Sequence, residues 1–372
     1  MDAGTKRIAI AANSASNILI FRRELIEAIR GAGFEPVVIV PPDPATEDRM
    51  AALGAHRVPV PMSRSGLNPF ADLALLRSYR SVLKALRPAA FLGFTIKPNI
   101  YGCIAAAALG VPAIANVSGL GTVFVRRSPL TALVERMYRF AFRRAAIVFF
   151  QNADDRDLFM QHRIVRGDQA RLLPGSGIDL TRYAPAPLPP GPVKFLLIAR
   201  LLGDKGVREY VEAARVLRSR MPEARFQLLG PLDSENRTSI HPRELQRWVA
   251  DGAVEYLGAA DDVRPFIAEA SAIVLPSYRE GLPRSLLEGA AMGRPLIASA
   301  VPGCRDVVEP GVNGLLCEAR DAQSLGDCMD AFLRLAPERR AQMGEAARRT
   351  AERFSHELVT RAYLDAVAEL RR

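Results

Sequence analysis

The chain has 372 residues, of which 49% are hydrophobic and 24% are charged. This length suits two domains of about 150 to 200 residues each, and the composition excludes an intrinsically disordered chain. The net charge of +10 arises within residues 1–185, which hold 24 Lys and Arg against 14 acidic residues, whereas the remainder holds 26 of each. A basic half favours an anionic partner such as nucleic acid or acidic lipid, although a soluble protein with a positive face has the same balance.

Cysteine and histidine patterns point away from a structural metal or a disulfide framework. The four cysteines form no C-x-x-C pair, and the four histidines do not cluster near them. The apolar run at residues 8–12 ends at Asn13, which is too short for a signal peptide. We therefore expect a cytoplasmic protein with no bound metal.

The first half of the chain alternates short apolar runs with helical patterns. The runs are residues 8–12, 36–41, 89–94, 112–117 and 145–151. This alternation predicts an α/β domain with a parallel, doubly wound sheet. Residues 98–125 carry no charge and are long enough to span a bilayer, but prolines, glycines and asparagines interrupt them. We interpret that stretch as helix, turn and buried strand.

A polar turn follows the first predicted strand, at residues 11–17. If two domains face each other, Asn13, Ser14 and Asn17 would face the cleft between them, on the side of the first domain. Ordinary capping of the next helix by Ser14 or Ser16 explains the same residues equally well.

A basic amphipathic segment occupies residues 126–144. Its apolar positions, including Leu133 and Phe140, recur at helical spacing. Its six arginines would suit an anionic bilayer, and they are Arg126, Arg127, Arg136, Arg139, Arg143 and Arg144. Alternatively, the apolar face packs inside the domain and only the arginines meet solvent. The first reading predicts a peripheral protein on the inner face of the cell membrane.

A proline-rich segment at residues 183–193 marks the predicted domain boundary, because its five prolines suit neither a helix nor a sheet. We expect an N-terminal domain over residues 1–186 and a C-terminal domain over residues 187–353. The second domain repeats the alternation at residues 194–199, 225–230, 254–258, 272–277, 295–300 and 314–319. A helix at about residues 354–372 is expected to pack back onto the first domain.

Two carboxylates flank a predicted strand-to-helix turn in the second domain. Glu280 falls in the loop and Glu288 in the helix, with Pro283 suited to the first helical position. The free amides of the first turn and the positive end of the helix would bind a diphosphate. Glu288 could hold ribose hydroxyls and Glu280 a sugar. As isolated residues, both would instead be solvated surface charges.

A second loop converges on the same sheet edge. The strand at residues 194–199 ends at Arg200, and Lys205 lies between Gly203 and Gly206. Both cations could stabilise the charge that develops on a departing diphosphate, without a metal. The alternative is that each is a surface cation.

These motifs resemble a known family. E-G-L-P-R-S-L-L-E (280–288), with R-x-x-x-x-K-G (200–206) before it and VPGCRDVVEPGVNGLL (301–316) after it, is similar to the retaining enzymes of glycosyltransferase family 4, over nearly the whole chain. Segments 21–30, 94–102, 118–124 and 151–159 resemble the bacterial branch that extends undecaprenyl-diphosphate-linked saccharides. The resemblance implies the GT-B fold, two facing Rossmann-like domains with a cleft between them. It also implies a UDP-N-acetylhexosamine donor, UDP-GalNAc or UDP-GlcNAc.

The resemblance also implies residue roles. Glu280 would contact the donor sugar's 3- and 4-hydroxyls, Glu288 would bind the ribose, and Arg200 and Lys205 would hold the diphosphate. The rest of the donor site would be lined by Gly203, Gly281, Leu282, Pro283 and Ser285. Many relatives carry a histidine after the threonine that corresponds to Thr95; here Ile96 and Lys97 follow, so Lys97 is the candidate on the acceptor side.

Two other functions fit parts of the pattern. A GT-B sugar-nucleotide epimerase would share the cleft but lack the acceptor. A nucleic-acid-binding protein would share the basic charge, but the sequence contains no recognised module or aromatic-interleaved basic patch.

Overall fold

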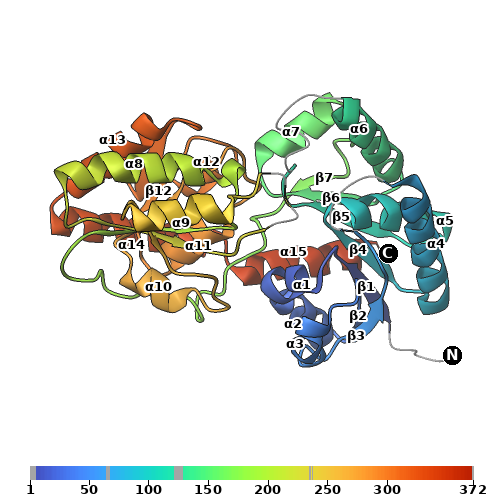
Figure 1. Ribbon diagram of the computed structural model, residues 1–372. Coiled ribbons are helices and arrows are strands. Elements are labelled where there is room, and N and C mark those ends of the chain that lie inside the picture. Colours follow the sequence, from blue (N-terminus) through green and yellow to red (C-terminus); the bar gives the residue numbers. More distant parts are fainter. Residues whose placement is uncertain (1–5, 64–67, 121–128, 234–235, 237, 371–372) are drawn as a thin grey trace. The chain divides into compact units, whose positions relative to one another are not determined.

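The computed structural model describes residues 6–63, 68–120, 129–233, 236 and 238–370 (Figure 1). The chain divides into two compact units, the first comprising Met1–Gly177 with His356–Arg372 and the second Ile178–Ser355. The proline-rich segment had suggested a division after residue 186. The two units divide after Gly177. The reason is that the backbone of Ile178 bonds to Phe354 at 2.9 Å and that of Ala186 to Met292 at 3.3 Å, which ties this stretch to the second unit.

The first unit is built on a seven-stranded parallel sheet of order β3-β2-β1-β4-β5-β6-β7. Its strands are β1 (Arg7–Ala11), β2 (Glu35–Val40), β3 (His56–Pro59), β4 (Ala90–Phe94), β5 (Ala113–Val117), β6 (Ile147–Phe150) and β7 (Ala170–Leu172). Sequence analysis missed β3 and β7, because both are short and incompletely buried and thus lack an apolar run.

Helices cover both faces of this sheet. Alternate strand residues face opposite sides, so Ala9 packs among α4 to α7 while Ile8 packs among α1, α2 and α15. The helical elements are α1 (Ala15–Phe21), α2 (Arg23–Gly31), η1 (Pro44–Thr46), α3 (Glu47–Ala51), α4 (Pro69–Leu86), η2 (Pro98–Gly102), α5 (Cys103–Ala108), α6 (Pro129–Phe142), α7 (Ala153–Gln161) and α15 (His356–Glu369).

Helix α15, the last of the chain, is anchored to the first unit by specific contacts. The Tyr363 hydroxyl accepts a hydrogen bond from Asn116 Nδ2 at 2.6 Å, and its ring packs on Phe149 with centroids 5.1 Å apart. Glu369 forms a bidentate pair with Arg171, with both distances 2.7 Å. The C-terminal helix is thus an integral part of the first unit's core.

The second unit repeats the plan with a six-stranded parallel sheet of order β10-β9-β8-β11-β12-β13. Its strands are β8 (Lys194–Ile198), β9 (Arg225–Leu229), β10 (Glu255–Tyr256), β11 (Ala272–Leu275), β12 (Leu296–Ser299) and β13 (Gly314–Cys317), each within a predicted run. Its helical elements are η4 (Gly203–Lys205), α8 (Val207–Arg220), α9 (Pro242–Ala250), α10 (Arg264–Glu269), α11 (Arg284–Ala291), α12 (Cys304–Val307), α13 (Ala322–Leu333) and α14 (Pro337–Glu352). Two parallel, doubly wound sheets confirm the predicted fold class.

Both sheets reverse their strand order at an equivalent place. In the first unit β1 lies between β2 and β4, and in the second β8 lies between β9 and β11. Open α/β sheets bind ligands at the carboxyl ends of the strands that flank such a switch point. The topology therefore directs attention to the loops after β1 and β4, and after β8 and β11.

The uncharged stretch that could have crossed a membrane is folded into the first sheet. Residues 98–120 form η2, α5 and β5. Within the described part of the chain, none of the helices has the length and apolar character needed to cross a bilayer.

Three buried tyrosines lead us to expect that the folded state loses stability at alkaline pH. Burial raises the pKa of Tyr79, Tyr138 and Tyr210 well above the ordinary value of 10.0. A raised native pKa contributes stability that is complete below the unfolded pKa and is lost as pH rises above it. We expect the free energy of unfolding to fall above about pH 10, by up to about 4 kcal/mol per pH unit for three such groups. Urea titrations from about pH 9 to about pH 11 measure this, and an unchanged midpoint would contradict it.

Candidate active site

Lys205 and Glu280 meet at the switch point of the second sheet. Lys205 ends the turn η4 after β8, and Glu280 lies in the loop after β11. The Lys205 Nζ and Glu280 Oε1 atoms are 2.5 Å apart, and the two side chains are 24% and 11% exposed. Two residues that the sequence assigned to one site are therefore in direct contact, although 75 positions separate them.

Two glycines allow the loops of this site to approach each other. Gly206, directly after Lys205, has φ +71°, and a Cβ there would lie 2.1 Å from the Pro276 carbonyl oxygen. Gly303 has φ +79°, and its Cβ would lie 2.3 Å from the carbonyl oxygen of Gly281, next to Glu280. Only glycine fits where backbone meets backbone this closely at positive φ.

The close approach at Gly303 gives a test of how finely the Glu280 loop must be placed. We expect Gly303→Ala to push this loop aside and to lower kcat/KM by about 100-fold, since small displacements of catalytic groups cost that much. Gly311→Ala is the matched control, because Gly311 has φ +76° but nothing within 4 Å of a new Cβ. Equal kcat/KM for the two variants would show that the contact does not position the loop.

Helix α11 begins next to Glu280. It spans Arg284–Ala291, and Pro283 precedes it with an extended φ of −76° and ψ of 115°. Pro283 is therefore the N-cap residue. The sequence had suggested that it is the first helical residue. The first-turn amides of Arg284, Ser285 and Leu286 lack acceptors within the helix and carry its positive end. Leu282 is buried in the core, so only its backbone can serve the site.

Glu288 lies on α11 and is bound by two donors that the sequence analysis missed. Its Oε1 accepts hydrogen bonds from the Tyr183 hydroxyl and from Arg284 Nε, both at 2.9 Å. Burial, together with the Glu288 charge, raises the pKa of Tyr183, so its hydroxyl remains a donor. The Arg284 contact follows from i, i+4 helical spacing. Tyr183, 105 positions away, could not be inferred from spacing.

Arg200 and Gly203 bond to other partners. Arg200 Nη1 is 2.7 Å from Asp233 Oδ2 with its side chain exposed, and the Gly203 amide donates to the Thr238 carbonyl oxygen at 2.6 Å. Of the predicted pair of cations, Lys205 is the one that contacts Glu280. Asp233 was not identified from the sequence.

The loops after β1 and β4 meet at the switch point of the first sheet. Ser14 caps α1 by accepting a hydrogen bond from the Asn17 amide at 3.2 Å, which is the capping alternative considered above. The Asn13 amide donates to Thr95 Oγ1 at 3.2 Å. Thr95 has φ +69°, a strained conformation for a β-branched residue, so Thr95 is a further candidate at this edge.

Lys97 is not available at this edge. Its side chain is buried, and its Nζ is 2.8 Å from both Asp72 Oδ1 and Ser63 Oγ. A buried lysine needs such a partner, and Asp72 on α4 supplies it. The sequence led us to expect Lys97 on the acceptor side. In the structure its side chain instead forms a buried ion pair with Asp72.

The basic helix α6 buries part of its apolar face and exposes the rest. Val134 is buried in the first unit, whereas Leu133 and Phe140 are exposed. Arg136, Arg143 and Arg144 are also exposed, and Arg139 donates to the His162 carbonyl oxygen at 2.8 Å. Arg126 and Arg127 lie outside the described residues.

No metal-binding cluster of three or more His, Cys, Asp or Glu side chains occurs in the described ranges.

Comparison with known proteins connects this site to a family. Residues 20–176 match the model of the glycosyl transferase 4-like domain, and residues 192–334 match that of glycosyl transferases group 1. Over 376 residues, covering 96% of this chain and 97% of the relative, the chain is 27% identical to N,N'-diacetylbacillosaminyl-diphospho-undecaprenol alpha-1,3-N-acetylgalactosaminyltransferase of Campylobacter jejuni. It is 24% identical over 280 residues, 71% of each chain, to UDP-Gal:alpha-D-GlcNAc-diphosphoundecaprenol alpha-1,3-galactosyltransferase of Escherichia coli.

Solved structures show the same fold. A glycosyltransferase from Rickettsia africae superposes with a TM-score of 0.81 at 17% identity, covering 99% of both chains. The HepE protein of Anabaena, solved with UDP and glucose, superposes with a TM-score of 0.80 at 18% identity, covering 98% of this chain and all of its own.

The fold and these matches define an enzyme, a glycosyltransferase with the two Rossmann-like domains of the GT-B class. The chain belongs to the group 1 glycosyltransferases with a 4-like N-terminal domain. The relatives named above are transferases, and they give no support to the epimerase alternative.

Proposed function

We propose that this enzyme transfers an N-acetylhexosamine from a UDP-sugar to a polyprenyl-diphosphate-linked saccharide, with retention of the anomeric configuration, in bacterial surface glycan synthesis. The observation that carries the proposal is the Lys205–Glu280 pair, formed with the loop that leads into α11. The printed activities of the Campylobacter and Escherichia relatives, which act on undecaprenyl-diphosphate-linked saccharides, support the choice of acceptor.

Charge placement supports the proposed chemistry. When the bond between the sugar's anomeric carbon and the UDP oxygen breaks, negative charge develops on the diphosphate. Lys205 and the first-turn amides of α11 are fixed donors that stabilise this charge, an effect worth several kcal/mol per donor. The acceptor oxygen bonds to the same face of the anomeric carbon, and its proton passes to the leaving phosphate. This scheme needs neither a protein base nor a metal.

The two carboxylates have distinct proposed roles. Glu280 contacts hydroxyls of the donor sugar, where its pair with Lys205 keeps it beside the diphosphate. Both hydrogen bonds to Glu288 end on Oε1. We assign Glu288 Oε2 to the ribose hydroxyls of the nucleotide, with Tyr183 and Arg284 fixing the carboxylate plane.

The acceptor side is assigned to the first unit. Asn13 and Thr95 meet at its switch point, which places hydrogen-bonding groups at the sheet edge where such folds bind ligands. The exposed Arg136 of α6, with Arg143 and Arg144 just after the helix, suits the anionic inner face of a membrane that carries the lipid-linked acceptor.

A donor screen tests the proposal. Purified enzyme is incubated with UDP-GlcNAc, UDP-GalNAc, UDP-glucose or UDP-galactose and short-chain polyprenyl-diphosphate saccharides, with and without EDTA. We expect transfer from a UDP-N-acetylhexosamine, an α-linkage by NMR, and the same rate in EDTA. Epimerised nucleotide sugar without acceptor, or complete loss of activity in EDTA, would contradict the scheme.

A further inference from the structure

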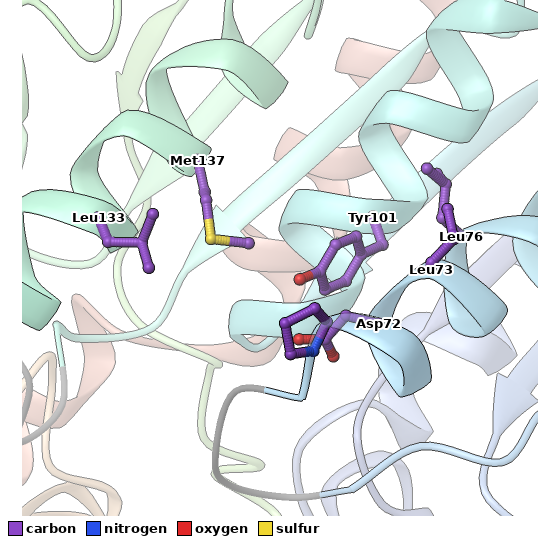
Figure 2. A pocket seen from close by; sticks show the side chains of 7 residues that line it. Asp72, Leu73, Leu76, Tyr101, Leu133 and Met137 are labelled. Atoms are coloured by element: carbon purple, nitrogen blue, oxygen red, sulfur yellow. The ribbon is translucent and has the colours of Figure 1, made fainter.

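The first unit contains an apolar groove between α4 and α6, named here the α4–α6 groove. Its volume is about 330 Å³, and it is lined mainly by Asp72, Leu73, Leu76, Tyr101, Leu133 and Met137. Figure 2 shows Leu133 and Met137 directed toward the Tyr101 ring from one side, with Leu73 and Leu76 of α4 on the other. This volume lies at the lower end of the range for small-molecule sites, about 300 to 1,000 Å³.

Large apolar side chains remain exposed along this groove. Leu73 and Leu133 line it and are exposed, Leu133 by 48%. Phe70, at the start of α4, is 86% exposed, and Phe140 on α6 is also exposed. Exposed apolar side chains that line a concavity, as Leu73 and Leu133 do, indicate a binding surface, because their hydration is unfavourable.

The topology places the groove residues toward the sheet edge that carries the Asn13 and Thr95 loops. Helix α4 follows β3, η2 follows β4, and α6 follows β5. In a parallel sheet, elements that follow strands begin at the carboxyl edge. The groove residues near the starts of α4 and α6 therefore lie toward the edge assigned to the acceptor.

The surroundings of the groove are strongly cationic. Residues 51–150 contain 13 Lys and Arg but only two acidic residues, Asp72 and Glu135. Both acids have partners, Lys97 at 2.8 Å and His162 at 3.0 Å. The exposed ionisable side chains of α4 and α6 are all cations, namely Arg77, Arg80, Lys84 and Arg136.

Apolar and cationic groups alternate by one helical turn on both helices. Arg77 follows Leu73 at i+4, and Arg136 follows Leu133 at i+3, so each cation shares a face with a groove residue. A ligand that carries an apolar chain next to an anionic group matches this arrangement. A flat bilayer would match the cations but not the concavity.

We propose that the α4–α6 groove binds the phosphate-proximal isoprene units of a polyprenyl diphosphate, with Arg77 and Arg136 beside its anionic end. This inference rests on the proposed lipid-linked acceptor and deepens it, by assigning a chain-binding site that is separate from the saccharide site. Leu73, Leu76, Leu133 and Met137 contact the chain, and the Tyr101 ring closes the floor.

Photolabelling tests the groove without requiring turnover. The full-length protein is irradiated with a diazirine-bearing farnesyl diphosphate, and labelled peptides are mapped by mass spectrometry. We expect labels within α4 and α6, protection by unlabelled farnesyl diphosphate, and at least tenfold less labelling in Leu133→Asp. Leu358→Asp is the matched control, since Leu358 on α15 is 46% exposed and lies outside the groove.

A charge variant keeps the test decisive if Leu133→Asp folds poorly. We expect Arg136→Glu to weaken labelling at least fivefold, whereas Arg23→Glu, an exposed arginine on α2, leaves it unchanged. Labels that map elsewhere, or labelling of Arg136→Glu at the wild-type level, would overturn the proposal.

Two other occupants give distinct outcomes. If Leu133→Asp abolishes sedimentation with phosphatidylcholine–phosphatidylglycerol vesicles but leaves photolabelling intact, the groove docks a bilayer and the isoprenoid proposal fails. If Leu133→Asp dissolves a dimer in sedimentation velocity and no label reaches the groove, the occupant is a second copy of the chain. Labelling in the groove without any sugar transfer in the donor screen would reject the proposed function while the chain-binding site stands.

Discussion

Lys205→Ala is expected to lower kcat by about 100- to 1,000-fold while the fold is retained. The Lys205 ammonium contacts Glu280, in the loop that leads into α11, where the leaving diphosphate is proposed to gain charge. Its removal takes away a donor that acts mainly in the transition state, so kcat falls more than the affinity for UDP. Because the Glu280 side chain is only 11% exposed, the loss of its cation should also lower the free energy of unfolding, by about 1 kcal/mol or more.

Lys194→Ala is the matched control for this experiment. Lys194 has a similarly exposed side chain, at 21%, and forms an ion pair with Glu269 at 2.8 Å. It begins strand β8, at the opposite end from the active-site loop. Steady-state kinetics and urea unfolding of both variants separate catalysis from stability, and similar kcat values for the two would reject the role of Lys205.

Arg294→Met is expected to lower the free energy of unfolding of the second unit by about 3 kcal/mol or more. Arg294 is fully buried and donates to four backbone carbonyl oxygens, those of Ile267 at 2.8 Å, Ala186 at 3.0 Å, Pro187 at 2.9 Å and Ala268 at 3.1 Å. Burial lowers its pKa to about 10. Methionine would fill the space but leave those acceptors without a donor, and each such buried group costs about 1 to 3 kcal/mol.

The control for Arg294 is Arg247→Met on the exposed face of α9, which should change the unfolding free energy by less than about 0.5 kcal/mol. Chemical denaturation followed by the fluorescence of Trp248, within the second unit, reports both variants. A stable Arg294→Met protein would mean that water or rearranged backbone satisfies the freed carbonyl oxygens.

The sequence predicted the strands that are buried on both faces and missed those that are not. Runs such as residues 36–41 and 272–277 coincide with β2 and β11, because a central parallel strand must be apolar throughout. The edge strands β3 and β7 lack this constraint and leave no continuous apolar run. The two units divide at Gly177 and not at the proline-rich segment, because prolines mark where regular structure stops, whereas packing decides which unit holds a segment.

The contact between Lys205 and Glu280 was predictable because loops at one sheet edge must converge. Lys205 and Glu280 follow adjacent strands, so topology alone brings them together. Contacts that depend on side-chain packing left no such signal. Tyr183 reaches Glu288, and Asp72 neutralises Lys97, through placements that no spacing rule specifies.

The strand order reverses once in each unit, and the two reversal points carry different kinds of chemical groups. In the second unit this point carries a lysine and a carboxylate, whereas in the first unit the backbone of Asn13 and the hydroxyl of Thr95 meet there without net charge. Ionic groups suit phosphate chemistry, and neutral hydrogen-bonding groups suit sugar hydroxyls. Under the proposed function, substitutions at residues 13 and 95 should change the acceptor preference while bond cleavage at Lys205 and Glu280 is left intact.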